Sequence, residues 1–137
     1  MQTELRVATV FVVDDDPDVL ISLRFLLETE GFAVRTFADG AALLEACRPA
    51  PDDCLVIDYK MPGMDGLELV GRLRERAITA PIVLVTAYPS ASLSARAAAW
   101  GVRHVVLKPH FEENLIAHVE AAMRESAAAG DDLRETP

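Results

Sequence analysis

The sequence predicts an α/β fold in which helices cover both faces of a doubly wound, parallel five-stranded sheet. Five short runs of apolar, largely β-branched residues alternate with five segments that show helical spacing of apolar residues. Most of these runs are apolar almost throughout, which is typical of parallel strands buried on both faces. Because the crossovers in such a sheet are right-handed, the strands present their carboxyl ends at one edge, where a ligand site is expected.

The five strands differ in their polar content and in the residue that follows each of them. The first run is nearly continuous, whereas the second is more polar, as suits a strand at the edge of a sheet. The third run leads directly into Asp58, and the fourth into Thr86. We expect strands at residues 7–13, 32–37, 54–57, 81–85 and 104–107.

The helices are predicted from start signals and apolar periodicity. Asp16 is a good N-cap before Pro17, and Asp65 with Glu68 three residues later forms a capping-box pattern. The fourth helix is mostly alanine and has little apolar mass to hold it against the sheet. The other helices are expected to begin at Asp39-Gly40, Pro89-Ser90 and Phe111.

Length and composition indicate one globular domain. The 137 residues are 51% hydrophobic and 26% charged, which argues against disorder. We expect residues 1–125 to form the domain and residues 126–137 an acidic, flexible tail or linker after a fraying helix. The net charge of −9 disfavours nucleic acid as a direct partner of this segment, because phosphate neutralisation requires lysine and arginine.

No targeting or conventional metal-binding pattern is evident. The N-terminus lacks the features of a signal peptide, and no apolar run is long enough to span a bilayer, so a cytoplasmic protein that does not bind membranes is expected. Cys47 and Cys54 fit no metal pattern and are expected to be free, with Cys54 in the core. His104, His110 and His118 have no ligand spacing, which favours surface or packing roles.

Polar side chains collect where four of the predicted strands end. Asp14, Asp15 and Asp58 would form a carboxylate cluster whose mutual repulsion a hard cation such as Mg²⁺ relieves. In such a cluster a carboxylate can attack a phosphoryl group and become an acyl phosphate. Lys108 can then pair with the phosphoryl oxygens, and Thr86 can donate a hydrogen bond to one of them.

In the order and spacing of four motifs, the chain resembles the receiver domain of two-component response regulators. The resemblance covers about residues 7–125, and the set of motifs is more specific than any one of them. The motifs are Val12-Val13-Asp14-Asp15-Asp16-Pro17, Asp58-Tyr-Lys-Met-Pro-Gly-Met-Asp-Gly66, Val85-Thr86-Ala87 and Leu107-Lys108-Pro109.

The resemblance implies a fold, a reaction and partners. The implied fold is flavodoxin-like, with strand order 2-1-3-4-5. Asp58 is implied to accept a phosphoryl group from a sensor histidine kinase, and the signal is expected to leave through the face made by the fourth and fifth helices and the fifth strand. Such a protein catalyses its own phosphoryl transfer and dephosphorylation but is not a conventional enzyme. A downstream effector protein or domain and a second copy of the chain are further implied partners.

The resemblance also assigns roles around the acceptor. Asp14 and Asp15 match the acid pocket, with Asp15 as the direct metal ligand, and the backbone carbonyl of Lys60 matches a third ligand. Thr86 and Lys108 match the switch hydroxyl and the phosphate-binding lysine. Lys60 together with Tyr88 occupies the positions that help set the lifetime of the acyl phosphate in this family.

Two positions depart from the family pattern. Val105 stands three residues before the lysine, where receivers commonly carry the tyrosine or phenylalanine of a rotating aromatic switch. Tyr88 and Trp100 are the aromatic candidates for that role. His110 follows Lys-Pro where phenylalanine is common, and Phe111 comes one residue later.

Two other functional readings are compatible with parts of the sequence. A receiver that has lost its switch would act as a phosphorylation-independent protein-binding module, and Val105 is the feature that supports this alternative. A phosphatase of the haloacid dehalogenase kind would use the Asp-x-Asp pattern within residues 14–16, but it would leave the Asp58 motif unexplained. A dinucleotide-binding enzyme is disfavoured because no glycine-rich turn follows the first strand.

Overall fold

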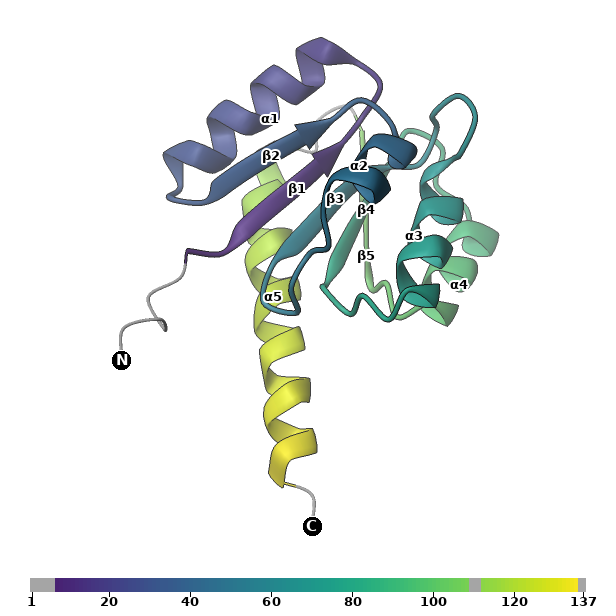
Figure 1. The fold of residues 1–137 in the computed structure, drawn as a ribbon. Coiled ribbons are helices and arrows are strands. Elements are labelled where there is room, and N and C mark those ends of the chain that lie inside the picture. The colour runs from purple at the N-terminus through teal and green to yellow at the C-terminus, as the bar shows by residue number, and fades with distance from the viewer. Residues whose placement is uncertain (1–6, 109–111, 136–137) are drawn as a thin grey trace.

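The computed structural model describes residues 7–108 and 112–135, which are built around a parallel sheet (Figure 1). The strand order is β2-β1-β3-β4-β5 and every pairing is parallel, so the predicted order 2-1-3-4-5 is confirmed. The strands are β1 (Thr9–Val13), β2 (Ala33–Phe37), β3 (Cys54–Asp58), β4 (Ile82–Thr86) and β5 (His104–Leu107).

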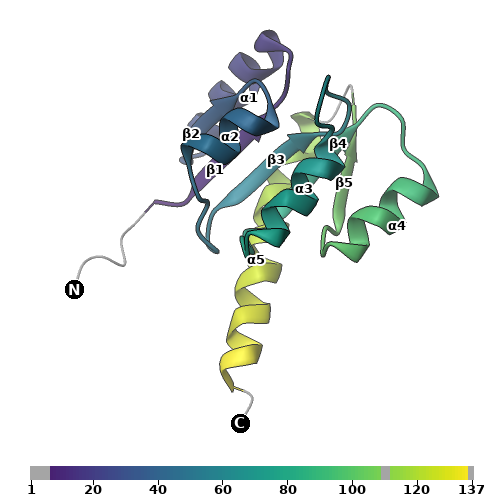
Figure 2. The same ribbon diagram turned by 45° about the vertical axis from the view of Figure 1, so that its right-hand side comes forward.

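Helices cover both faces of this sheet, as the two views in Figures 1 and 2 show. Side chains of the first and fifth helices pack in one apolar cluster, and those of the second, third and fourth helices pack in another. The fold is therefore the three-layered, doubly wound architecture that the sequence predicted. The helices are α1 (Pro17–Thr29), α2 (Gly40–Ala46), α3 (Gly66–Glu75), α4 (Ala91–Ala99) and α5 (Glu112–Glu135).

Alternate residues of each strand enter the two clusters. In β1, Val10 and Val12 face α1 and α5, whereas Phe11 and Val13 face the opposite layer. This alternation explains why the central strands read as continuous apolar runs, since neither face meets water. The edge strand β2 differs as predicted, because its exposed Arg35 lies over the Phe11 and Phe37 rings, at 6.0 and 5.3 Å from their centroids.

Polar side chains cap the helices where the sequence placed their starts. The Asp16 carboxylate accepts a hydrogen bond from the Asp18 amide at the start of α1. Asp65 and Glu68 form a reciprocal capping box at the start of α3, with hydrogen bonds of 2.8 and 2.9 Å. These caps supply partners for amides that have none within the helix. The start of α5 predicted at Phe111 lies outside the described residues, as do Pro109 and His110.

In the structure α5 continues beyond residue 125 to Glu135, while a flexible tail or linker at residues 126–137 stays a prediction. Alanine has the highest helix propensity, so the alanine run at residues 127–129 carries the helix forward despite the single glycine that follows. The final turns project beyond the sheet in both views (Figures 1 and 2). Among the described residues, no helix combines the length and apolar character needed to cross a membrane.

A buried aspartate that the sequence did not single out holds the amino end of the sheet. Asp53 is 1% exposed, and its carboxylate accepts hydrogen bonds from the amides of Thr9 (2.9 Å) and Ala50 (2.8 Å). The next residue, Cys54, is buried, and burial raises the pKa of its thiol to about 12. Both cysteines are free, and Cys54 is a core residue, as predicted.

The loop from β3 to α3 requires a glycine where α3 begins. The Gly66 amide donates a 2.8 Å hydrogen bond to the Tyr59 carbonyl, which draws the helix start onto the end of β3. A Cβ atom at Gly66 would overlap the carbonyl oxygen of Asp58 and approach the Tyr59 Cα to 2.9 Å. Since those atoms are backbone, they cannot move aside without displacing Asp58.

Gly66→Ala is therefore expected to lower the free energy of unfolding by on the order of 1–3 kcal/mol, as measured by urea denaturation. Gly71→Ala is the matched control within α3, because its Cβ would meet the Trp100 side chain at 3.3 Å rather than backbone. Gly71→Ala should lower the free energy of unfolding by less than Gly66→Ala does, since alanine also favours helix. Equal losses for the two variants would contradict the role assigned to Gly66.

Candidate functional site

The predicted site residues meet at the carboxyl edge of the sheet. Asp14 and Asp15 follow β1, while Asp58 and Thr86 are the last residues of β3 and β4. Lys108 follows β5, and its side chain reaches Asp14 although 94 positions separate the two residues in the sequence. The parallel strand order produces this meeting, because all these strands end at the same edge.

The three acidic residues form a compact cluster of oxygen atoms. One carboxylate oxygen from each of Asp14, Asp15 and Asp58 lies within 4.8 Å of the others. Asp14 and Asp58 are buried, whereas Asp15 is exposed. The Asp14 carboxylate also accepts a 2.9 Å hydrogen bond from the Asp16 amide, which fixes its orientation. Three oxygen ligands so close together form a set that a hard divalent cation can occupy.

The amine of Lys108 bridges the two buried carboxylates. Its Nζ atom donates a 3.0 Å hydrogen bond to Asp14 Oδ2 and lies 3.2 Å from Asp58 Oδ1. The Lys108 backbone amide donates a 2.8 Å hydrogen bond to the Thr86 carbonyl. The lysine therefore joins the ends of four strands through its side chain and its backbone.

Burial and charge act in opposite directions on this cluster. The pKa of Asp58 is raised from 3.8 to about 6, chiefly by burial and then by the Asp14 carboxylate, while Lys108 acts in the opposite direction. Burial tends to lower the pKa of Lys108, but its hydrogen bond and attraction to Asp14 and Asp58 raise it overall. At neutral pH the site therefore holds a charged amine and an Asp58 carboxylate that is mostly ionised.

Thr86 connects the site to the loop that leads into α4. Its side chain is buried, and its Oγ1 atom accepts a 3.0 Å hydrogen bond from the Tyr88 amide. Because the oxygen is the acceptor in this bond, the bond leaves the hydroxyl hydrogen unused. Two residues further on, Ser90 caps α4. A movement of the Thr86 hydroxyl is thus coupled directly to the backbone that enters α4.

Lys60 and Tyr88 form a contact that the sequence did not predict. The Lys60 ammonium lies 5.8 Å from the centroid of the Tyr88 ring, in cation–π geometry. Lys60 follows Asp58 by two residues and Tyr88 follows Thr86 by two, so the pair spans the loops after β3 and β4. The metal-ligand role expected of the Lys60 carbonyl stays a prediction.

The aromatic candidates lie in different places. Val105 is partly buried and packs on the cluster that contains α3 and α4. Trp100 caps the carboxyl end of α4, remote from Thr86, and its ring lies close to Gly71. Tyr88, which is 69% exposed, is therefore the aromatic candidate beside the Thr86 loop.

Residues 10–120 match the model of the response regulator receiver domain. The chain belongs to this family. The match includes every predicted site residue, and the buried acid cluster, the bridging lysine and the strand-end threonine lie together in this receiver. The family is one of signalling domains, and the acid cluster is a candidate metal site.

Relatives of this receiver include longer transcriptional regulators. The transcriptional regulatory protein FixJ of Bradyrhizobium diazoefficiens is 35% identical over 120 residues, which are 88% of this chain and 58% of that protein. KdpE of Mycobacterium tuberculosis is 34% identical over 122 residues, which are 89% of this chain and 54% of that protein. The chain thus spans little more than half the length of these relatives.

Solved structures share the fold at comparable similarity. The response regulator StyR matches with a TM-score of 0.83 and 37% identity, covering 94% of this chain and 65% of that one. The chemotaxis protein CheY4 of Vibrio cholerae matches with a TM-score of 0.76 and 27% identity, covering 85% of this chain and 99% of that one. The same fold therefore occurs both within longer regulators and as nearly the whole of a chain.

The raised pKa of Asp58 predicts a measurable cost in stability. The folded protein binds the Asp58 proton more tightly than the unfolded chain does, so stability falls as pH rises from about 4 through about 6. Asp58→Asn removes this cost and should raise the free energy of unfolding at pH 7.5, without divalent ions, by on the order of 1–3 kcal/mol. The gain should largely disappear near pH 4.

Urea denaturation at both pH values checks this expectation. Asp16→Asn is the matched control, because asparagine also caps helices and Asp16 lies outside the cluster. A gain that is independent of pH, or that is equal in the control, would contradict the pKa argument.

Proposed function

We propose that this receiver accepts a phosphoryl group on Asp58 from the phosphohistidine of a sensor histidine kinase, with Mg²⁺ in the acid pocket. The observation that carries the proposal is the placement of Asp58. Its carboxylate is buried at the end of β3, 3.2 Å from the Lys108 amine and next to the Asp14 and Asp15 carboxylates. A nucleophile, a cationic phosphate ligand and a candidate metal site thus share one edge of the sheet.

The donor set fits Mg²⁺. Asp15 and Asp58 would act as direct ligands with the Lys60 carbonyl, and the buried Asp14 would complete the pocket. When bound, Mg²⁺ neutralises charge on the carboxylates and on the transferred phosphoryl group. The exposure of Asp15 leaves one side of the cluster open to ligand water, which Mg²⁺ usually retains.

In the transfer step a carboxylate oxygen of Asp58 forms a bond to phosphorus as the phosphorus–nitrogen bond of the donor breaks. The electron pair of that bond leaves with the donor imidazole. Asp58 is mostly ionised at neutral pH and serves as the nucleophile. Lys108 stays protonated and pairs with a phosphoryl oxygen in place of the neutralised Asp58 carboxylate.

The proposed signal passes through Thr86. When its hydroxyl donates to a phosphoryl oxygen, Oγ1 moves toward Asp58, and its bond to the Tyr88 amide lengthens or breaks. The backbone that enters α4 then shifts, which alters the face made by α4, β5 and α5. A downstream effector or a second copy of the chain would recognise that face.

The receiver would also hydrolyse its own acyl phosphate. The Lys60–Tyr88 pair would lengthen the lifetime of this acyl phosphate by limiting the approach of water over the pocket.

Residues 126–137 would connect the receiver to an effector domain in a longer regulator, since the chain spans little more than half of FixJ and KdpE. The projecting end of α5 is suited to that role (Figure 1).

Val105 favours one alternative function. Without an aromatic side chain at that position, the signal would not use the common aromatic switch, and the chain would act as a phosphorylation-independent binding module. A direct test of phosphorylation separates the two functions.

Incubation with acetyl phosphate and Mg²⁺ is expected to add one phosphoryl group to the wild type, as measured by intact-protein mass. The gain should disappear without Mg²⁺ and in Asp58→Asn, because each removes part of the reaction centre. Asp16→Asn should be phosphorylated like the wild type. No gain in the wild type would favour the binding module, and a gain that persists in Asp58→Asn would remove the assignment of Asp58.

Thr86→Ala is expected to accept phosphate yet fail to transmit it. Phosphorylation should shift the amide resonance of Tyr88 strongly in the wild type, because the Thr86 hydroxyl leaves that amide. The shift should be at least halved in Thr86→Ala and retained in Thr86→Ser, which keeps the hydroxyl. ¹H–¹⁵N spectra recorded before and after phosphorylation measure it. A full shift in Thr86→Ala would rule out the hydroxyl as the coupling group.

A further inference from the structure

Two histidines face each other at the edge of the sheet opposite to the phosphoryl site. His104 begins β5, and His118 lies in α5. Their Nδ1 atoms are 3.0 Å apart, and their rings meet edge to face with 76° between the planes. Since Lys108 follows the other end of β5, the pair is separate from the acid cluster.

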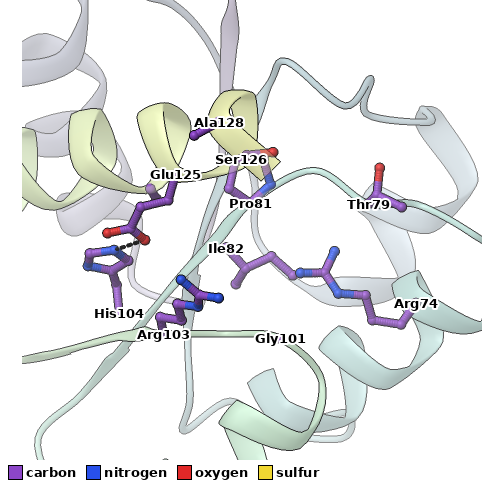
Figure 3. A pocket seen from close by; sticks show the side chains of 11 residues that line it. Arg74, Thr79, Pro81, Ile82, Gly101, Arg103, His104, Glu125, Ser126 and Ala128 are labelled. Atoms are coloured by element: carbon purple, nitrogen blue, oxygen red, sulfur yellow. Dashed lines mark hydrogen bonds and ion pairs between the residues drawn. The ribbon is translucent and has the colours of Figure 1, made fainter. Parts of the chain in front are cut away.

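A carboxylate orients one member of this pair. Glu125 Oε1 lies 3.0 Å from His104 Nε2, as the dashed line in Figure 3 shows. Because a carboxylate only accepts hydrogen bonds, Nε2 of His104 carries a proton, and the neutral ring keeps its lone pair on Nδ1. That lone pair is directed at His118. A carboxylate behind an imidazole in this way is the usual support of a metal-binding histidine.

His118 can present a second lone pair to the same point. Burial and the neighbouring His104 lower the pKa of His118, so its ring is neutral at neutral pH. In the metal-free protein, one shared hydrogen between the two Nδ1 atoms accounts for the 3.0 Å contact. If the proton of His118 moves to its Nε2 atom and both rings turn until their lone pairs converge on one point beside the line between the two nitrogens, both Nδ1 atoms become free to bind a cation.

The separation of the two nitrogens selects among metals. With metal–nitrogen distances of roughly 2.0–2.1 Å, two nitrogens 3.0 Å apart subtend an angle of about 90–100° at the ion. That angle matches neighbouring positions of a square-planar or octahedral site, whereas a tetrahedral site needs a wider one. Imidazole ligands in such geometry are typical of Cu²⁺ and Ni²⁺.

Two arginines lie near the histidine pair, in the lining of a neighbouring cavity. Arg74 and Arg103 line a cavity of about 410 Å³ that also contains His104 and Glu125, but His118 is not among its lining residues (Figure 3). Arg74 is held in place by hydrogen bonds to the carbonyls of Ile78, Ala80 and Trp100. The carboxylate of Glu125 shares this cavity with the two arginines.

We propose that His104 Nδ1 and His118 Nδ1 bind one late divalent transition-metal ion, with Glu125 as the positioning residue of His104. Water would complete the coordination, since His118 is only partly buried. The ion would cross-link β5 to α5, two of the elements in the proposed output face. This site does not depend on phosphorylation of Asp58.

Titration of the untagged chain with Ni²⁺ in an excess of Mg²⁺ tests the proposal. Calorimetry should give one equivalent of Ni²⁺, with affinity at least about tenfold weaker in His104→Ala and His118→Ala, and about tenfold weaker in Glu125→Gln. His110→Ala is the matched control, because it removes the third histidine of the chain. His110→Ala and Asp58→Asn should both bind like the wild type. Paramagnetic Ni²⁺ should broaden the ring resonances of His104 and His118.

Several outcomes would overturn the site. Wild-type affinity in His118→Ala, an equal loss in His110→Ala, or a loss in Asp58→Asn would each place the ion elsewhere. A cooperative urea transition shows that each variant is folded. His118→Gln, which keeps a hydrogen-bonding side chain, serves as a second variant if alanine disturbs α5, and it should show the same loss of affinity.

Discussion

An amine shared between two buried carboxylates is the interaction on which the rest of this structure depends. Lys108 lies about 3 Å from Asp14 and from Asp58, and all three side chains are largely removed from water. Two carboxylates buried alone would be strongly unfavourable, and one positive charge between them offsets part of that cost. The remaining cost of burial is seen in the pKa of Asp58, which is raised to about 6.

The same cluster connects the chemistry to the scaffold. The Lys108 backbone amide donates a hydrogen bond to the Thr86 carbonyl, and the Thr86 hydroxyl oxygen accepts one from the Tyr88 amide, so the acid cluster is joined to the loop that leads into α4. At the opposite edge of the sheet, His104 and His118 join β5 to α5. The two ends of β5 therefore carry two different polar contacts, one at the acid cluster and one beside α5.

The sequence by itself determined the fold class, the order of the elements and the members of the acid site. Short, largely β-branched apolar runs that alternate with helical segments favour a parallel sheet buried on both faces, and right-handed crossovers then bring the ends of the strands together. The helix N-caps at Asp16 and Asp65 could also be predicted from the sequence, because an N-cap depends on residues within one helical turn. Local rules of this kind need no knowledge of distant contacts.

Only the tertiary structure decided several other contacts between residues that are distant in the sequence. Asp53, the Lys60–Tyr88 pair and the two facing histidines have no signal in sequence spacing, because each contact depends on strand register and on how a helix lies over the sheet. The continuation of α5 to Glu135 follows from alanine propensity, although one glycine and several acids lie in the same segment. The charge balance around Asp58 likewise arises from burial, which only the folded chain provides.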